Sequence, residues 1–166
     1  MTLQIKKNHN TTQWSGGETT ELFIYPKDAE YKTGNYHFRL STATVEVEES
    51  TFTSLPGVDR TLLVLEGEMK LEHSGHHSIL LKPLDSDHFK GEWTTKSIGK
   101  CVDFNLMCKS GIQGAVKGYL LVENTEIKIQ PKGNMNFIFL YQGAIETEGL
   151  KMAPKELLIF DSPSSS

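Results

Sequence analysis

Residues 36–47 read YHFRLSTATVEV, and the alternation within this stretch decides the fold class. One parity carries aromatic and aliphatic side chains, namely Tyr36, Phe38 and Leu40. The other parity carries a charge and a hydroxyl among small apolar side chains, namely Arg39, Ser41, Ala43, Val45 and Val47. Successive side chains of a strand point to opposite faces, so this period of two predicts a β-strand that is covered on both faces.

The same period recurs along the chain, and no window shows the i, i+3, i+4, i+7 spacing of an amphipathic helix. Further strands are predicted at residues 61–65, 69–72, 79–81, 101–107, 118–122, 126–130, 137–141 and 157–160. The first two of these form a predicted hairpin around Gly67, and residues 73–78 form a predicted polar loop. Many short strands separated by glycine, proline and asparagine predict an all-β barrel or sandwich.

The length of the chain limits its domain organisation. Its 166 residues, 37% of them apolar, suffice for one compact domain or two fused half-domains. Residues 63–69 and 139–145 share an apolar pattern around a glycine at an offset of 76 residues, as two small barrels in tandem would. Residues 162–166 are a predicted disordered tail.

Composition excludes several classes of partner. With 17 Lys and Arg against 21 Asp and Glu, the net charge is −4, so no broad basic surface exists for nucleic acid. No run approaches the ~18 apolar residues of a membrane span, and residues 1–10 lack the apolar segment of a signal peptide. Cys101 and Cys108 lie too far apart along a predicted strand for a disulfide. We expect a cytoplasmic protein with reduced thiols and without nucleic-acid or membrane partners.

The segment SLPGVDR, residues 54–60, leads directly into the strand predicted at residues 61–65. Pro56 and Gly57 favour a tight turn, which fixes the direction of the side chains that follow. Arg60 would then stand at the mouth of a small barrel, where its planar guanidinium suits a carboxylate through two parallel hydrogen bonds. The alternative is an Asp59–Arg60 ion pair on the surface.

Charged side chains on apolar strand faces need a partner or a ligand. Arg39 lies on such a face, and Asp103 and Asn105 share one face of the strand predicted at residues 101–107. Together with Ser41, these polar groups predict a cavity between strands. The alternative is a buried Arg39–Asp103 pair without a ligand.

Two further features carry weaker signals. Residues 14–21 combine Trp14, two glycines and several hydroxyls, which predicts either a lid over a pocket or an N-terminal turn. A metal site needs three or four ligands at defined spacing. No strand carries a His-x-His pair among the histidines, which are His9, His37, His73, His76, His77 and His88. The sequence therefore predicts neither a metal nor another cofactor.

Five motifs occur in a recognisable order along the chain. They are W-x-G-G-x-T-x-E at residues 14–21, F-R-x-S-x-A-x-V at 38–45, F-x-x-x-P-G-x-D-R at 52–60, F-x-G at 89–91 and D-F-N-L-M at 103–107. In this order they resemble the HutD/Ves family over about residues 13–110, whereas residues 73–77 and 82–88 follow no pattern of that family. The resemblance implies a metal-free, cupin-like double-stranded β-helix with two fused barrels, a bicupin. A first barrel with N-terminal strands would occupy residues 1–110, and a trimmed second barrel, sharing strands with the first, would occupy residues 111–161. It also implies these pocket residues: Trp14, Thr19, Glu21, Arg39, Ser41, Arg60, Asp103 and Asn105.

The resemblance further implies a function without a firmly assigned enzymatic activity. We expect a non-catalytic protein that binds a small carboxylate such as urocanate or formylglutamate and moderates histidine utilisation, or that acts in a stress response. The alternative is a metal-independent isomerase or hydrolase with Asp103 or Glu21 as general base beside Arg60. A third hypothesis is a protein–protein module, and sheet packing between cupin-like barrels implies a homodimer.

Overall fold

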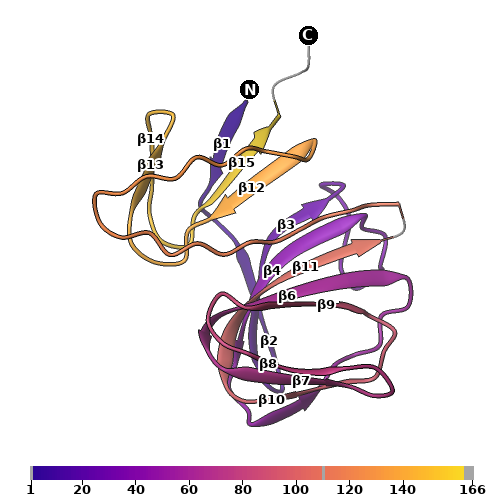
Figure 1. Ribbon diagram of the computed structural model, residues 1–166. Coiled ribbons are helices and arrows are strands. Elements are labelled where there is room, and N and C mark those ends of the chain that lie inside the picture. The colour runs from indigo at the N-terminus through magenta and orange to yellow at the C-terminus, as the bar shows by residue number, and fades with distance from the viewer. Residues whose placement is uncertain (1, 110, 163–166) are drawn as a thin grey trace. The chain divides into compact units, whose positions relative to one another are not determined.

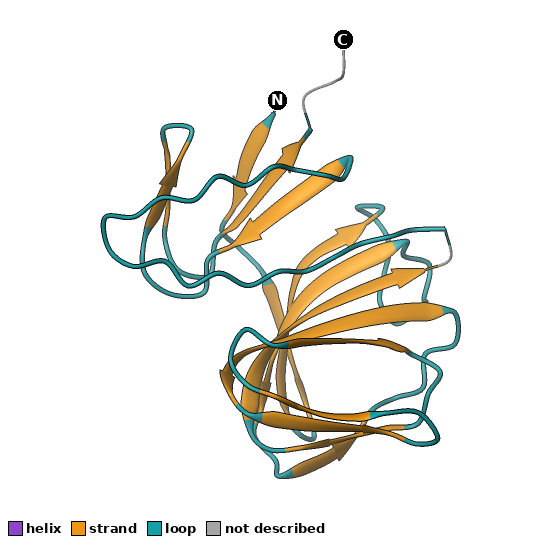
Figure 2. Cartoon of the chain, in the orientation of Figure 1, coloured by secondary structure: helices purple, strands orange, loops and turns teal. Residues whose placement is uncertain are grey.

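The computed structural model describes residues 2–109 and 111–162, and every regular element within them is a β-strand (Figure 1, Figure 2). The prediction of an all-β fold is confirmed. In this part of the chain no helix has the length and apolar character that crossing a membrane requires. Ser162 donates a hydrogen bond to the Gly133 carbonyl oxygen, and the rest of the predicted tail, residues 163–166, lies outside the described residues.

The chain divides into two compact units, and the larger one lies within residues 10–119. Its first sheet is antiparallel and has six strands, in the order β2 (Asn10–Trp14), β3 (Gly17–Tyr25), β4 (Phe38–Val45), β11 (Cys101–Lys109), β6 (Val58–Gly67) and β9 (Ser86–Lys90). Its second sheet is antiparallel and has four strands, in the order β5 (Glu49–Thr51), β10 (Thr95–Ile98), β7 (Met69–His73) and β8 (Ser78–Leu81). The predicted strands at residues 61–65, 69–72, 79–81 and 101–107 are therefore confirmed.

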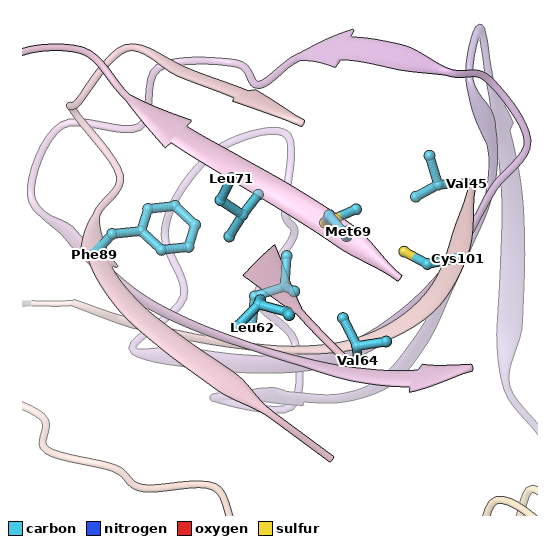
Figure 3. Close-up of a cluster of buried hydrophobic side chains, with 8 residues drawn as sticks. Val45, Leu62, Val64, Met69, Leu71, Phe89 and Cys101 are labelled. Atoms are coloured by element: carbon cyan, nitrogen blue, oxygen red, sulfur yellow. The ribbon is translucent and has the colours of Figure 1, made fainter. Parts of the chain in front are cut away.

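The core of the larger unit lies between these two sheets (Figure 3). The six-stranded sheet contributes Val45, Leu62, Val64, Phe89 and Cys101, and the four-stranded sheet contributes Met69, Leu71 and Leu81. Leu62, Val64, Met69, Leu71 and Leu81 are fully buried. Each of these residues follows the period of two along its strand, so the alternation that predicts the strands also selects the core.

The smaller unit is formed by residues 2–9 and 120–162. It holds a three-stranded sheet in the order β1 (Leu3–Lys6), β15 (Leu157–Asp161) and β12 (Met135–Phe139), and a hairpin of β13 (Ile145–Thr147) and β14 (Leu150–Met152). Leu140, Met152 and Leu158 form its buried core. The barrel boundary predicted at residue 110 and the second barrel that shares strands with the first both stay predictions.

The strands predicted at residues 118–122 and 126–130 are wrong, because both segments are loop. Their alternation is present in the sequence, but their apolar side chains stay exposed, among them Leu120 and Val122 at 85% and 72% and Ile127 and Ile129 at 41% and 43%. Neither segment pairs with a strand within the described part of the chain. A period of two forms a strand only where a neighbouring strand accepts its hydrogen bonds.

The predicted hairpin around Gly67 is also wrong. β6 pairs with β11 and β9, whereas β7 pairs with β10 and β8, so the chain passes from one sheet to the other at this glycine. Gly67 has a φ of 81°, and a Cβ atom there would lie 2.6 Å from the carbonyl oxygen of Lys100. Gly67 therefore allows the chain to cross from one sheet to the other. In the sequence, a glycine at such a crossing looks the same as a glycine in a hairpin turn.

Gly67→Ala is expected to lower the free energy of unfolding more than Gly75→Ala does. Both glycines have positive φ, but a Cβ atom at Gly75 would meet nothing within 4 Å. Both variants carry left-handed strain of about 1–2 kcal/mol, and only Gly67→Ala adds the cost of overpacking, about 1–3 kcal/mol. Urea denaturation of the two variants measures this difference, and equal losses would contradict the crowded crossing.

Candidate functional site

The register of the six-stranded sheet places seven of the eight predicted pocket residues on one face. Met107 pairs with both Arg39 and Arg60, and Asn105 pairs with Ser41. Asp103 pairs with Ala43, and β3 adds Glu21 opposite Ser41 and Thr19 opposite Ala43. Directly paired residues project from the same face, so this inner face carries Thr19, Glu21, Arg39, Ser41, Arg60, Asp103 and Asn105.

Five of these residues form a polar layer between two apolar clusters. The layer consists of Arg39, Ser41, Arg60, Asp103 and Asn105, all of which are buried. Along β11, Cys101 belongs to the core between the sheets, whereas Met107 belongs to a second cluster with Tyr36 and Val58. Asp103 and Asn105 lie between these two ends of the strand. A buried polar layer is costly unless its groups are paired, so each partner matters.

Arg60 is 7% exposed and stands against two aromatic rings. Its Cζ atom lies 4.9 Å from the ring centroid of Phe52 and 5.2 Å from that of Phe89. Its Nε atom has no hydrogen-bond partner among the residues that the structure describes. The alternative of an Asp59–Arg60 surface pair is wrong, because Asp59 accepts a 2.6 Å hydrogen bond from Lys90 while Arg60 is buried.

Arg39 has a partner of its own. Its Nε atom donates to Glu21 Oε2 at 2.9 Å, and its Cζ atom lies 4.2 Å from the centroid of the Tyr31 ring. The predicted alternative of an Arg39–Asp103 pair is therefore wrong: the register brings Glu21 of β3 beside Arg39. The charge of Arg39 is compensated by a carboxylate, whereas Arg60 forms no ion pair in the described chain.

Asp103 and Asn105 each present a buried oxygen without a partner. Asp103 Oδ1 and Asn105 Oδ1 accept no hydrogen bond from the described residues, and the Ser97 hydroxyl, 1% exposed on β10, is in the same state. Burial raises the pKa of Asp103 to about 7, although the nearby Arg60 guanidinium acts to lower it. Burial likewise lowers the pKa of Arg60, against the opposing effect of groups that include Tyr31 and Asp103. Both directions show that desolvation outweighs the attraction between these two residues.

Comparisons with known proteins identify the family and the fold of this chain. A model of the HutD family matches residues 6–166. The chain belongs to the HutD family. Protein Ves from Escherichia fergusonii is 33% identical over 98 residues, which are 56% of this chain and 49% of Ves. The chain therefore spans about half the length of this curated relative.

Two solved structures extend the likeness of this HutD-family chain to its fold. The conserved protein of unknown function PA5104 from Pseudomonas aeruginosa PAO1 has a TM-score of 0.80 at 25% identity, covering 98% of this chain and 88% of that one. HutD from Pseudomonas fluorescens SBW25, in its formate condition, has a TM-score of 0.67 at 20% identity, with 97% and 88% covered. The cupin-like all-β fold is confirmed, and its bicupin detail stays a prediction.

Among the predicted pocket residues outside the polar layer of this HutD-family chain, Thr19 and Glu21 lie beside it, whereas Trp14 lies far from it. It pairs with Gly17, whose row continues to Val45, six residues and so ~20 Å along β4 from Arg39. Its ring covers Gly16 and lines a surface hollow of about 270 Å³ on the β2–β3 turn. A second hollow, of about 330 Å³, lies near Asp59 and His88. Neither hollow includes a residue of the polar layer.

Sequence reasoning missed a second buried polar cluster in this HutD-family chain. The side chain of His73 is fully buried, and its Nε2 atom lies 2.6 Å from Asp87 Oδ2, while His77 Nε2 lies 2.7 Å from Asp87 Oδ1. The predicted polar loop at residues 73–78 is therefore wrong at both ends, because His73 ends β7 and Ser78 begins β8. The parity of Met69, Leu71 and His73 was the available signal, because it places His73 on the inner face.

Proposed function

We propose that this HutD-family protein binds a small carboxylate in its polar layer. Arg60 would hold the anion, and Asp103 and Asn105 would contact the polar remainder of the ligand. The observation that carries the proposal is the set of unpartnered atoms in one buried layer, Arg60 Nε, Asp103 Oδ1 and Asn105 Oδ1. Buried polar groups without partners are rare in native proteins, and a ligand with donors and acceptors would satisfy them.

The charge of the layer favours an anion. Arg39 and Arg60 are the only arginines in the sequence, and both are buried. Glu21 compensates Arg39, but with a pKa of about 7 Asp103 compensates Arg60 only in part at neutral pH. A carboxylate would complete this balance through charge-assisted hydrogen bonds to the guanidinium.

Family membership suggests the ligand class. Membership of the HutD family supports a role in histidine utilisation or a stress response. We propose urocanate or formylglutamate as the ligand. We propose a non-catalytic role, in which binding of the carboxylate to the polar layer moderates histidine utilisation. Two buried free thiols, Cys101 and Cys108, support a reducing compartment such as the cytoplasm.

Calorimetry with the full chain tests the proposal. Urocanate, formylglutamate and the diamide of formylglutamate are titrated separately, the diamide serving as the uncharged control. We expect saturable binding of at least one acid and none of the diamide. Absence of binding by every acid, or equal binding of acid and diamide, would overturn the proposal.

The affinity for formylglutamate is expected to fall as pH rises through about 7, the raised pKa of Asp103. Ionisation of Asp103 places a second negative charge in the layer, beside the carboxylate that Arg60 holds. If the ligand binds only while Asp103 is protonated, Kd rises roughly tenfold between about pH 6 and pH 8. Titrations at these two pH values measure the change, and an unchanged Kd would remove Asp103 from the contact.

The pKa of Asp103 also favours a second candidate function, a metal-independent isomerase or hydrolase. A general base works best when its pKa lies near the working pH, and burial brings that of Asp103 to about 7. Conversion of a bound acid that stops in Asp103→Asn would support this role. Recovery of the acid unchanged after long incubation with stoichiometric protein would exclude it for that acid.

A further inference from the structure

The cluster of His73, His77 and Asp87 holds three metal-ligating groups in close contact. One ligand atom from each side chain lies within 4.8 Å of the others. Asp87 lies on β9 opposite Leu62, and His73 lies at the end of β7 opposite Thr95 of β10. The cluster therefore joins the edge of the six-stranded sheet to the four-stranded sheet, and it uses none of the residues of the polar layer.

We propose that His73, His77 and Asp87 bind a divalent transition-metal ion such as Zn²⁺. Two imidazoles and one carboxylate form a donor set that zinc and related metals accept, with a further position open to water. The ligand atoms now stand at hydrogen-bond distances of 2.6 and 2.7 Å. Metal–ligand distances of about 2.0–2.2 Å in tetrahedral geometry would separate them by ~3.4 Å, so shifts of under ~1 Å suffice.

The surroundings of His73 orient it for this role. Its Nδ1 atom lies 2.7 Å from Thr95 Oγ1, which leaves Nε2 directed at Asp87. The Phe89 ring, with its centroid 4.5 Å away, and the Trp93 ring, at 5.6 Å, limit rotation of the imidazole. A ligating histidine commonly donates its other N–H to an oxygen acceptor, and the Thr95 hydroxyl can accept it.

The side chain of His77 connects the cluster to solvent, and its position favours metal binding. Its side chain is 43% exposed, whereas those of His73 and Asp87 are 0% and 7% exposed. A hydrogen bond from a half-exposed imidazole adds little to stability, and His73 alone would satisfy one oxygen of Asp87. Both Nε2 atoms lie against one carboxylate, and the exposed part of His77 gives solvent access to the cluster, as a three-ligand site requires.

The site is separate from the motifs that carry the family resemblance. Its ligands come from residues 73–87, between the F-x-x-x-P-G-x-D-R motif at residues 52–60 and the F-x-G motif at residues 89–91. The neighbouring histidines have other contacts: the ring of His76 stacks on Trp93 at 3.7 Å, and His88 Nδ1 lies 3.2 Å from Thr61 Oγ1. His76 therefore offers a matched control within the same loop.

The test titrates the full chain, freed of metal by a chelator, with Zn²⁺ by calorimetry and with Co²⁺ by visible absorption. We expect a single saturable site and the absorption bands of Co²⁺ in a low-symmetry site of nitrogen and oxygen ligands. His77→Ala, at a half-exposed position, is expected to weaken metal binding by more than about 10-fold. Thr95→Val is expected to weaken it by roughly 10–100-fold, because the Thr95 hydroxyl orients His73. His76→Ala is expected to leave the affinity unchanged.

Three results would overturn the proposal. The first is a wild-type chain that binds neither ion at a single site, and the second is an equal loss in His76→Ala and His77→Ala. The third is unchanged affinity in both His77→Ala and Asp87→Asn, which would place the bound ion elsewhere. Circular dichroism of each variant verifies the fold, and His77→Gln, a change at the same half-exposed position, replaces His77→Ala if that variant does not fold.

Discussion

Arg60→Met abolishes most of the carboxylate affinity if the guanidinium holds the anion. Methionine keeps much of the side-chain volume between Phe52 and Phe89 but removes both the charge and the donors. Loss of a charge-assisted contact costs about 2 kcal/mol or more, so we expect Kd to rise at least ~30-fold. Calorimetry with the acid that binds the wild-type chain most tightly measures this effect.

Lys90→Met is the matched control for Arg60→Met. Lys90 lies on the adjacent strand β9, is half-exposed and pairs with Asp59, so the variant makes the same change in net charge outside the polar layer. We expect its Kd to match that of the wild-type chain. Unchanged binding in Arg60→Met, or an equal loss in both variants, would contradict a direct contact between Arg60 and the ligand.

Asp103→Asn is expected to change how stability depends on pH. Burial raises the pKa of Asp103 from 3.8 to about 7 in the folded chain, so between these values the folded state retains a proton that the unfolded state has released. The contribution of this group is therefore fully present below pH 3.8 and is lost as pH rises to about 7. About 3 pKa units correspond to ~4 kcal/mol, which Asn, having no titrating group, does not lose.

Urea denaturation of wild type and Asp103→Asn across this pH range measures the difference. We expect the variant to gain stability relative to wild type as pH rises from 4 towards 7, and the gain to level off above about 7. Asp59→Asn, on a half-exposed carboxylate paired with Lys90, is expected to change stability by less than ~1 kcal/mol throughout. A gain in Asp103→Asn that is constant with pH would show that the buried carboxyl does not titrate between these values.

Alternation alone predicts much of the fold and part of the site. A period of two locates β4, β6 and β11, and the parity within β4 and β11 places Arg39, Ser41, Asp103 and Asn105 on faces that also carry core residues. Since directly paired residues project from the same face, these side chains come together once β4 and β11 are neighbours. The alternation within β4 and β11 therefore predicts most residues of the polar layer.

The pairing partners within the site depend on register, which parity does not determine. Nothing in the sequence near Arg39 indicates that Glu21, on a different strand, compensates its charge. A register shift between Glu21 and Phe23 also changes the alignment of β3 with β4. One residue of slip exchanges the two faces of a strand, so a local pattern cannot select between Glu21 and Asp103 as the partner.

The errors also have physical causes. The exposed residues 126–130 alternate like a strand but have no neighbour to pair with, and Gly67 marks a crossing instead of a hairpin. The loop prediction fails at His73 because the glycine and polar residues after it dominate the local composition. In each case the outcome depends on a strand distant in sequence, which local composition does not encode.

The pairing of β1 with β15 has a consequence for how the chain is made. Leu3 pairs with Phe160, so β1 leaves the ribosome well before β15, the strand with which it pairs. All the strands of the larger unit emerge during that delay and can complete their own pairings. Until translation reaches residue 157, β1 has backbone groups open to proteases and to strands of other nascent chains.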